Sequence, residues 1–281
     1  MAKRKLVWNE NKIKEFIKEG RGSGEGESYK PWLNTQDFPS MGMATRIFGK
    51  KTNRMHHFFS NTQLNYFYLL EWEDQVIDIR EHYPLLDLED VLKDTSDLKL
   101  NKFQNKENST SYIFSTSFLI TLLDKDRKRK YVARSIKYAS ELSKVMTQEK
   151  LEIERRYWQE GKGIDWGIVT NKDINSVRAK NIEWLHSVIN SSEYIGFSQS
   201  EIEGLLEGLL YRFSKSDRSI RDILIGYEQD YDLDKGTGLL LFKYMVANKR
   251  VLVDMDKPIS ISNNSSTLMF PTLKTEGVVS L

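Results

Sequence analysis

The sequence predicts an α/β protein built from two domains, the first containing a β-sheet and the second mostly helical. Two apolar stretches at 115–120 and 131–137 flank a strongly charged turn, which is the pattern of a β-hairpin. Beyond the polar stretch at 170–173, apolar residues recur at helical spacing in successive segments. This change of pattern predicts domains at 1–170 and 171–281.

The composition narrows the class of protein. The chain has 281 residues, of which 39% are hydrophobic and 29% charged, and a net charge of +2, as expected of a soluble globular protein with a sizeable core. It has no cysteine, which excludes disulfides, cysteine-based zinc sites and cysteine nucleophiles. The four histidines argue against a histidine-rich metal site, so a cation held by oxygen ligands is the metal to consider.

No stretch of the sequence is typical of membrane insertion or export. No apolar run reaches the roughly 18 residues of a membrane span. The N-terminal residues lack the apolar core of a secretory signal. We therefore expect a cytoplasmic protein with no membrane partner.

The first predicted elements are a short helix and a glycine-rich loop. Residues 9–19 mix apolar and charged side chains in the pattern of an amphipathic helix. Residues 20–27 carry glycine at alternate positions and cannot lie inside a helix or a strand. Such a loop either lies on the surface or brings Arg21 and its own backbone close to a phosphate. No Gly-Lys-Ser/Thr follows it, so it is not a nucleotide-binding P-loop.

Residues 44–59 predict two strands joined by a turn at 50–53. Because neighbouring side chains on a strand point to opposite faces, His56 and His57 cannot easily bind one metal. We therefore interpret them as packing or surface residues.

The middle of the chain predicts further helices and strands. Ser60 has the features of a helix N-cap, with Gln63 as its partner in a capping box. Residues 76–81 alternate apolar and charged side chains, as in a half-buried strand. The remaining expectations are a polar loop at 87–110 with a short helix at 88–92, a helix at 146–160 and a buried strand at 164–169.

The turn of the central hairpin is rich in cations. It is either a solvated hairpin tip or a contact for the phosphates of a nucleic acid. Its cations are Lys125, Arg127, Lys128, Arg129 and Lys130.

The C-terminal domain predicts four helices followed by a strand. A helix pair followed by a β-hairpin is the order of a winged helix, a module that binds DNA or protein. The predicted helices are 177–189, 200–213, 220–228 and 239–248, and the strand is 250–255.

Several stretches together resemble the TnsA family, the endonuclease subunits of heteromeric transposons. The resemblance covers about the first 190 residues, whereas the last third matches only in length and helical character. The matching stretches are 17–26, 29–33, 46–47, 51–57, 70–73, 77–81, 84–86, 115–119, 150–158 and 181–185.

The resemblance implies a restriction-endonuclease-like N-terminal domain and a winged-helix C-terminal domain. It also implies a role in DNA transposition, in which TnsA nicks the strand that the TnsB transposase leaves uncut. The implied partners are transposon-end DNA, a TnsB-like transposase and a TnsC-like AAA+ ATPase that contacts the C-terminal region. The implied location is the bacterial cytoplasm, at the nucleoid during transposition.

Most of the positions that correspond to the family's active site carry other residues in this sequence. The family uses Glu, Asp, Gln and Lys, and these positions fall on Gln63, Ser117, Ser135 and Lys137, so that only the lysine is retained. The family's Mg²⁺ requires anionic oxygen ligands, and an amide or a hydroxyl is a weak substitute. We therefore expect little metal binding and little or no nicking.

Three functional interpretations remain open. In the first, the protein is an architectural subunit that contacts DNA through Arg21 and the basic turn. In the second, it is an active nickase whose metal ligands have moved to Glu71, Glu73, Asp78 or Glu141. In the third, it is a stand-alone winged-helix DNA-binding protein.

Overall fold

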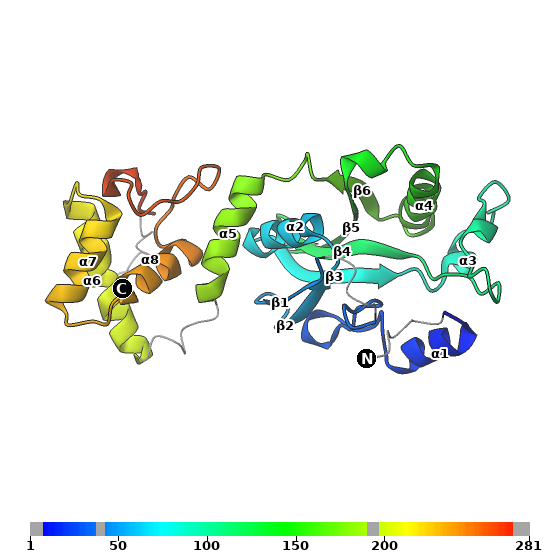
Figure 1. The fold of residues 1–281 in the computed structure, drawn as a ribbon, viewed down its shortest axis with the longest axis horizontal. Coiled ribbons are helices and arrows are strands. Elements are labelled where there is room, and N and C mark those ends of the chain that lie inside the picture. Colours follow the sequence, from blue (N-terminus) through cyan, green and yellow to red (C-terminus); the bar gives the residue numbers. More distant parts are fainter. Residues whose placement is uncertain (1–7, 38–42, 190–196, 272–281) are drawn as a thin grey trace, which may run out of the picture. The chain divides into compact units, whose positions relative to one another are not determined.

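The structure is a computed structural model that describes residues 8–37, 43–189 and 197–271 (Figure 1). The chain divides into two compact units, Met1–Ile174 and Asn175–Leu281. Each unit is considered separately below.

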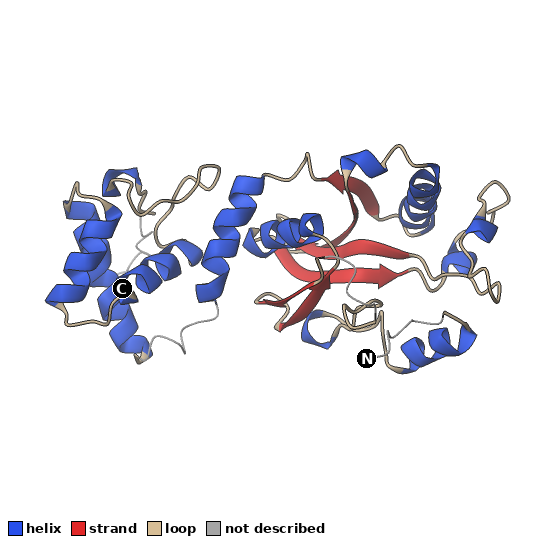
Figure 2. Ribbon diagram, in the orientation of Figure 1, coloured by secondary structure: helices blue, strands red, loops and turns tan. Residues whose placement is uncertain are grey.

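The first unit is built on a four-stranded sheet in the order β3-β4-β5-β6 (Figure 2). Strands β3 (Val76–Pro84), β4 (Ser115–Leu123) and β5 (Arg129–Lys137) are antiparallel neighbours. Strand β6 (Asp165–Thr170) pairs with β5 in parallel. The predicted central hairpin is therefore confirmed, and a parallel connection is added to it.

Both faces of this sheet are covered, because side chains alternate along β4. Phe118 points to the face that carries helix α2 (Asn61–Trp72) and the two-stranded β1–β2 sheet, and its ring lies 5.8 Å from that of Phe58. The next residue, Leu119, packs in the cluster that contains Leu151 of helix α4 (Val145–Arg155). The predicted strands at 44–59 are β1 (Thr45–Gly49) and β2 (Arg54–Phe58).

Helix α4 runs into a π-helical turn, η4 (Arg156–Gly161). The turn buries two consecutive rings, Tyr157 and Trp158. A Cβ atom added to Gly161 would overlap the side chain of Val91, so this turn packs closely on helix α3 (Leu88–Val91). The connection from β5 to β6 is thereby fixed against the sheet.

The N-terminal segment packs as an ordered unit. Helix α1 (Glu10–Lys18) buries Phe16 in a cluster with Trp8 and Trp32. In the glycine-rich loop that follows, Gly22 has a φ of +79°, and a Cβ atom there would overlap the ring of Pro84. The loop therefore needs glycine both for its backbone conformation and for its contact with β3. The short helices of this unit are η1 (Gly26–Ser28), η2 (Leu100–Lys102) and η3 (Ala139–Glu141).

Strand β3 is almost entirely buried, whereas its alternating pattern predicts one solvated face. Asp78, Arg80, Glu81 and His82 all have less than a tenth of their surface exposed. Glu81 accepts hydrogen bonds from Nη1 and Nη2 of Arg54 at 2.9 and 2.6 Å and lies 2.8 Å from Nδ1 of His56. The β1–β2 sheet thus covers the face that carries Glu81. The glycine-rich loop contacts Asp78 and Arg80, on the face that the pattern assigns to solvent.

This burial shifts the pKa values of two groups on β3. Burial alone would raise the pKa of Glu81, but the charge of His56 and the hydrogen bonds from Arg54 outweigh it, so the pKa lies well below 4.5. Burial lowers the pKa of His82 to about 4, and its Nε2 lies 2.9 Å from the carbonyl oxygen of His57. Both shifts favour the folded state at neutral pH over acid pH, because the unfolded chain binds protons more readily.

In the second unit, the described residues form four α-helices packed around an apolar core. They are α5 (Ser176–Ile189), α6 (Gln199–Lys215), α7 (Ile220–Asp230) and α8 (Thr237–Ala247). Leu209, Tyr227 and Phe242 are fully buried between them. A short helix, η6 (Ser265–Thr267), follows. A membrane-crossing segment is absent from the described helices, because none combines the necessary length with enough apolar character.

The strand predicted at 250–255 is wrong. The N–H groups of Arg250 and Val251 both bond to the carbonyl oxygen of Met245, so these residues cap helix α8. Only Leu252 pairs with another segment, in an isolated bridge to Met269. Within the described residues, the hairpin of the predicted winged helix is thus reduced to a single bridge, and the winged helix is not confirmed.

We expect Glu81→Gln to lower the free energy of unfolding by about 3 kcal/mol, because the change leaves Arg54 buried without its charge partner. Urea unfolding followed by circular dichroism would measure the loss. Glu27→Gln is the matched control, since Glu27 is exposed and we expect a change within about 0.5 kcal/mol. Equal stability of the two variants would contradict this account of β3.

Candidate functional site

Ser135 lies in the core of the first unit and does not face a cleft. Only 1% of its surface is exposed. Its hydroxyl donates to Oε2 of Glu154 on α4 and accepts a hydrogen bond from Nε1 of Trp166 at 3.0 Å. Thr116 donates to the same carboxylate oxygen at 3.0 Å. Ser135 is thus part of a closed hydrogen-bond network between the sheet and α4.

Ser117 contributes to the strand pairing with its side chain. The regular ladder between β4 and β5 ends at the pair Phe118–Arg134. One step further, the hydroxyl oxygen of Ser117 accepts the N–H of Ile136 at 2.9 Å. The hydroxyl therefore replaces a backbone partner at the point where the two strands separate.

Gln63 and Lys137 line one shallow depression of about 310 Å³. The N–H of Gln63 donates to the Ser60 hydroxyl at 3.2 Å, which confirms Ser60 as the N-cap of α2. The amide oxygen of Gln63, however, accepts the N–H of Phe59 at 3.0 Å. The predicted reciprocal capping box is therefore wrong by one residue, because the Gln63 side chain bonds to the N–H of Phe59 and not to that of Ser60.

Among the displaced carboxylates, only Glu141 lines this depression with Gln63 and Lys137. Glu71 accepts the N–H groups of Lys50 and Lys51 at the β1–β2 turn, and burial raises its pKa.

The other two candidates lie elsewhere. Asp78 accepts the N–H of Gly26 at 3.2 Å, in the glycine-rich loop. Glu73 is exposed at the C-terminal end of α2. The structure therefore does not bring the four carboxylates together, and in residues 8–37, 43–189 and 197–271 no three acidic or histidine side chains are arranged to hold a metal ion.

Two residues next to the site were not predicted from the sequence, Glu154 and Lys150. Glu154 is 1% exposed, and its Oε1 lies 4.0 Å from Nζ of Lys150. Burial lowers the pKa of Lys150, Glu154 partly offsets this, and the charge of Lys137 lowers it further. The sequence does contain a sign of the buried Glu154. It lies at helical spacing between Leu151 and Trp158, on the apolar stripe of the helix.

The cations of the hairpin turn are all exposed. The turn itself spans residues 124–128, so Arg129 and Lys130 lie in β5 and not in the turn. The carboxylate of Asp124 accepts the N–H groups of Asp126 and Lys128 at 2.9 and 2.8 Å, which holds the turn in shape. This geometry leaves Lys125, Arg127 and Lys128 exposed at the tip of the hairpin.

The glycine-rich loop suggested that Arg21 is exposed and able to contact a phosphate, but its side chain is only 10% exposed. Its guanidinium forms a two-point ion pair with Asp37, at 2.6 and 3.1 Å, and a third contact with Glu19 at 2.7 Å. The guanidinium carbon also lies 3.6 Å from the ring centre of Phe16. These contacts give Arg21 a structural role in holding the N-terminal segment.

Comparison of the sequence with known proteins shows the family of this chain. The family model of the TnsA-like endonuclease N-terminal domain matches residues 73–171, and that of the TnsA endonuclease C-terminal domain matches residues 173–255. The chain belongs to the TnsA family.

A curated relative extends the match over most of the chain. Transposon Tn7 transposition protein TnsA of Escherichia coli is 38% identical over 251 residues, which cover 88% of this chain and 87% of that protein. The resemblance noted in the sequence is thereby confirmed.

We expect Ser135→Gln, which introduces the residue that the resemblance implies for this position, to destabilise the protein by about 1–3 kcal/mol. The larger side chain must enter a filled core next to Glu154. Thermal unfolding would show a lower midpoint. Ser140→Gln makes the same change at an exposed position and should leave the midpoint nearly unchanged. A wild-type midpoint for Ser135→Gln would mean that the core has room for the amide.

Proposed function

We propose that this TnsA-family chain is an architectural subunit of a DNA transposition complex that nicks the second strand poorly or not at all. It would bind transposon-end DNA and dock a TnsB-like transposase and a TnsC-like ATPase. The observation that carries this proposal is the state of the family's active-site positions, where the oxygen atoms of Gln63, Ser117 and Ser135 are already used by the fold.

These oxygens do not fit the Mg²⁺ that the family implies. All three are neutral, and each is engaged by a backbone N–H or by another side chain. A divalent cation needs anionic oxygens to offset the loss of its hydration shell. Lys137 supplies a positive charge, which suits a DNA phosphate.

The surfaces left for DNA and protein partners are the basic turn and the C-terminal unit. The turn presents Lys125, Arg127 and Lys128 on a projection that can follow a phosphate backbone. The C-terminal unit, for which the sequence predicts a winged helix, is the part that we assign to the ATPase. Both assignments follow the family membership and the charge distribution.

We expect the wild type to leave the second strand uncut on transposon-end DNA with Mn²⁺ and TnsB- and TnsC-like partners, whereas Gln63→Glu combined with Ser117→Asp should cut it. The added carboxylates supply the missing anionic ligands next to Lys137. Denaturing gels of end-labelled DNA would measure cleavage. Ser135 stays unchanged here, because its replacement threatens the fold.

The matched control combines Gln63→Glu with Ser117→Asn, which has nearly the shape of aspartate without its charge. This variant should remain inactive. Cutting by the wild type would refute the architectural role. The architectural role would also be refuted if the wild type failed to assemble with its partners on transposon-end DNA.

An active nickase with displaced ligands is the second candidate, and the position of Glu141 favours it. Glu141 lines the same depression as Gln63 and Lys137, although its Oε2 accepts the N–H of Tyr138 at 3.1 Å. Breaking this hydrogen bond would free the carboxylate within the depression that Lys137 also lines.

If this second candidate holds, Glu141→Gln should lower Mn²⁺-dependent nicking at least about tenfold, as expected for the loss of a group that supports a metal. Nicking would be followed on supercoiled and end-labelled DNA. Glu73→Gln, at an exposed position, should retain full activity. Unchanged nicking by Glu141→Gln would reject Glu141 as a ligand.

A further inference from the structure

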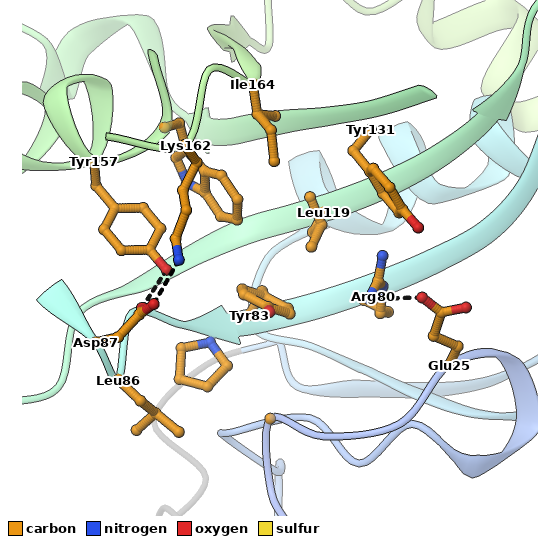
Figure 3. A pocket seen from close by; sticks show the side chains of 13 residues that line it. Glu25, Arg80, Tyr83, Leu86, Asp87, Leu119, Tyr131, Tyr157, Lys162 and Ile164 are labelled. Atoms are coloured by element: carbon orange, nitrogen blue, oxygen red, sulfur yellow. Dashed lines mark hydrogen bonds and ion pairs between the residues drawn. The ribbon is translucent and has the colours of Figure 1, made fainter. Parts of the chain in front are cut away.

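A second cavity lies away from the candidate site, beside the glycine-rich loop. Its volume is about 420 Å³, and its walls come from β3, β4, β5, the turn η4 and the loop itself (Figure 3). It combines tyrosine rings with cations, including Tyr83, Tyr131, Arg80 and Lys162. Neither the proposed DNA contacts nor the family's active-site positions use it.

Arg80 is the buried charge of this cavity, with 7% of its side chain exposed. Its Nε is buried without a hydrogen-bond partner, although Oδ2 of Asp78 lies 3.2 Å away. Its guanidinium carbon lies 5.7 Å from the ring centre of Tyr83 and 5.6 Å from that of Tyr131. Arg80 thus lies close to two aromatic rings, and its Nη2 donates to the Thr121 hydroxyl at 3.3 Å. Among the described residues, its Nη1 makes only the long contact of 3.6 Å with Glu25.

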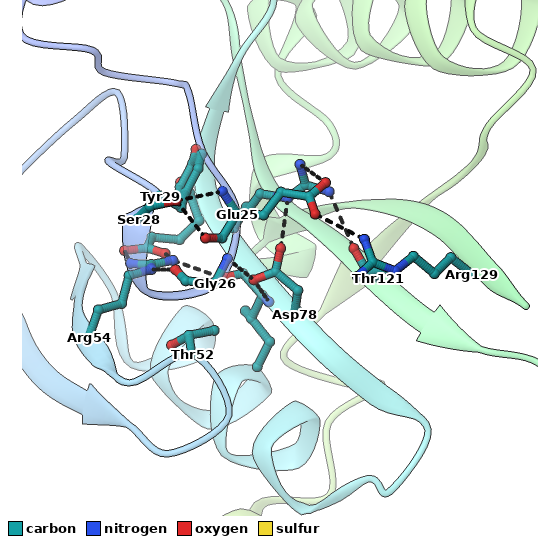
Figure 4. A network of polar contacts seen from close by, with 12 residues as sticks. Glu25, Gly26, Ser28, Tyr29, Thr52, Arg54, Asp78, Thr121 and Arg129 are labelled. Carbon is teal, nitrogen blue, oxygen red and sulfur yellow. Dashed lines mark hydrogen bonds and ion pairs between the residues drawn. The ribbon is translucent and has the colours of Figure 1, made fainter. Parts of the chain in front are cut away.

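Glu25 of the glycine-rich loop lies between Arg80 and Arg129 (Figure 4). Its Oε2 accepts a hydrogen bond from Nη1 of Arg129 at 3.1 Å. Its Oε1 is 3.6 Å from Nη1 of Arg80, which is beyond hydrogen-bond distance. A half-exposed carboxylate thus occupies the position between two guanidinium groups, and it satisfies only one of them.

The loop can release Glu25 without unfolding. On one side of Glu25, Gly22 packs on Pro84, and on the other the N–H of Gly26 donates to Asp78 at 3.2 Å. These two anchor points hold the backbone, so a rotation of the Glu25 side chain is enough to open the site.

We propose that this cavity binds a nucleotide unit, with the phosphate between Arg80 and Arg129 in place of Glu25 and the base against Tyr83 and Tyr131. Guanidinium groups bind phosphate through paired hydrogen bonds, and tyrosine rings accept any base by stacking. The volume lies in the range of about 300–1,000 Å³ typical of small-ligand sites. The proposal deepens the proposed DNA-binding function by naming a site for one nucleotide.

The charges around the cavity support an anionic ligand. Asp78 pairs with Arg80, and Asp87 pairs with Lys162 and accepts a hydrogen bond from Tyr157. Departure of Glu25 therefore leaves Arg129 unpaired and the site positive. An acidic peptide would satisfy the two arginines equally well but would gain no base stacking from the tyrosine rings that line the cavity, so the nucleotide is favoured.

The first test is the binding of fluorescently labelled oligothymidylate to the full chain, measured by anisotropy. Glu25→Gln removes the competing carboxylate and should tighten binding about three- to tenfold, the effect of roughly one exposed ion pair to a phosphate. Glu27→Gln removes the same charge from the same loop and should change affinity less than about twofold. Equal effects of the two variants would overturn the proposal, because they would show only long-range repulsion.

The second test uses thymidine monophosphate as a competitor, since a single nucleotide cannot bridge from the cavity to the basic turn. Arg129→Gln should weaken this competition, whereas Lys172→Gln, at an exposed position outside the proposed contacts, should leave it unchanged. With the oligonucleotide, Arg129→Gln should also reduce the slope of log K against log salt by about 0.7. Competition by a polyglutamate peptide but not by the nucleotide would overturn the proposal in favour of a protein ligand.

The third test locates the base. Single-stranded DNA carrying 5-iodouracil should photocrosslink to Tyr83 or Tyr131, as mapped by mass spectrometry. Crosslinks only outside the cavity would contradict the proposal. Binding of the monophosphate as tightly as the strand would identify a free nucleotide as the ligand, and tighter binding of the strand than of monophosphate or duplex would identify DNA.

The two proposals fail in different experiments. If Glu25→Gln behaves like Glu27→Gln while the chain still assembles with its partners on end DNA, only the nucleotide site is wrong. If assembly fails while the Glu25→Gln effect persists, only the architectural role is wrong.

Discussion

The buried ion pair between Arg54 and Glu81 is the interaction on which the first unit depends. Arg54 also donates to the carbonyl oxygens of Gly26 and Ile79, at 3.2 and 2.7 Å, so one guanidinium joins the loop, the β1–β2 sheet and the central sheet. Tyr29 adds a bond from its hydroxyl to the carbonyl oxygen of Glu81 at 3.0 Å. Burying such a pair is costly unless every hydrogen bond is made, and here nearly all of them are.

The same ion pair helps to position one of the two sites of the unit. The loop that Arg54 holds in place carries Glu25 to the nucleotide cavity, on the side of the sheet where Leu119 contacts α4. The positions that the resemblance assigns to the family's active site include Ser117 and Ser135, whose hydroxyls form hydrogen bonds inside the fold. The network around Ser135 adjoins the cavity, because Trp158 lines the cavity and donates to Thr116.

The elements that could be predicted are those whose signal is local. The hairpin at 115–137, the cap at Ser60 and the helices of the second unit follow from periodicity and capping. The burial of β3 could not be predicted, because the partners of its charged residues come from β2, far away in sequence. The site positions were predicted from the family resemblance. Their hydrogen bonds could not be predicted, because Glu154 and Ser135 meet only through the packing of α4 on the sheet. The strand at 250–255 failed because a helix cap outcompeted it.

The π-helical turn η4 has a consequence for how the chain tolerates insertions and deletions. A π-helical turn holds about one residue more than an α-helical turn. Tyr157 and Trp158 of η4 are both buried, and a Cβ atom at Gly161 would overlap the side chain of Val91. Deleting one residue would rotate the residues that follow by about 100° and disturb this close contact. Relatives of this chain should keep the length between α4 and β6 even where the residues themselves vary.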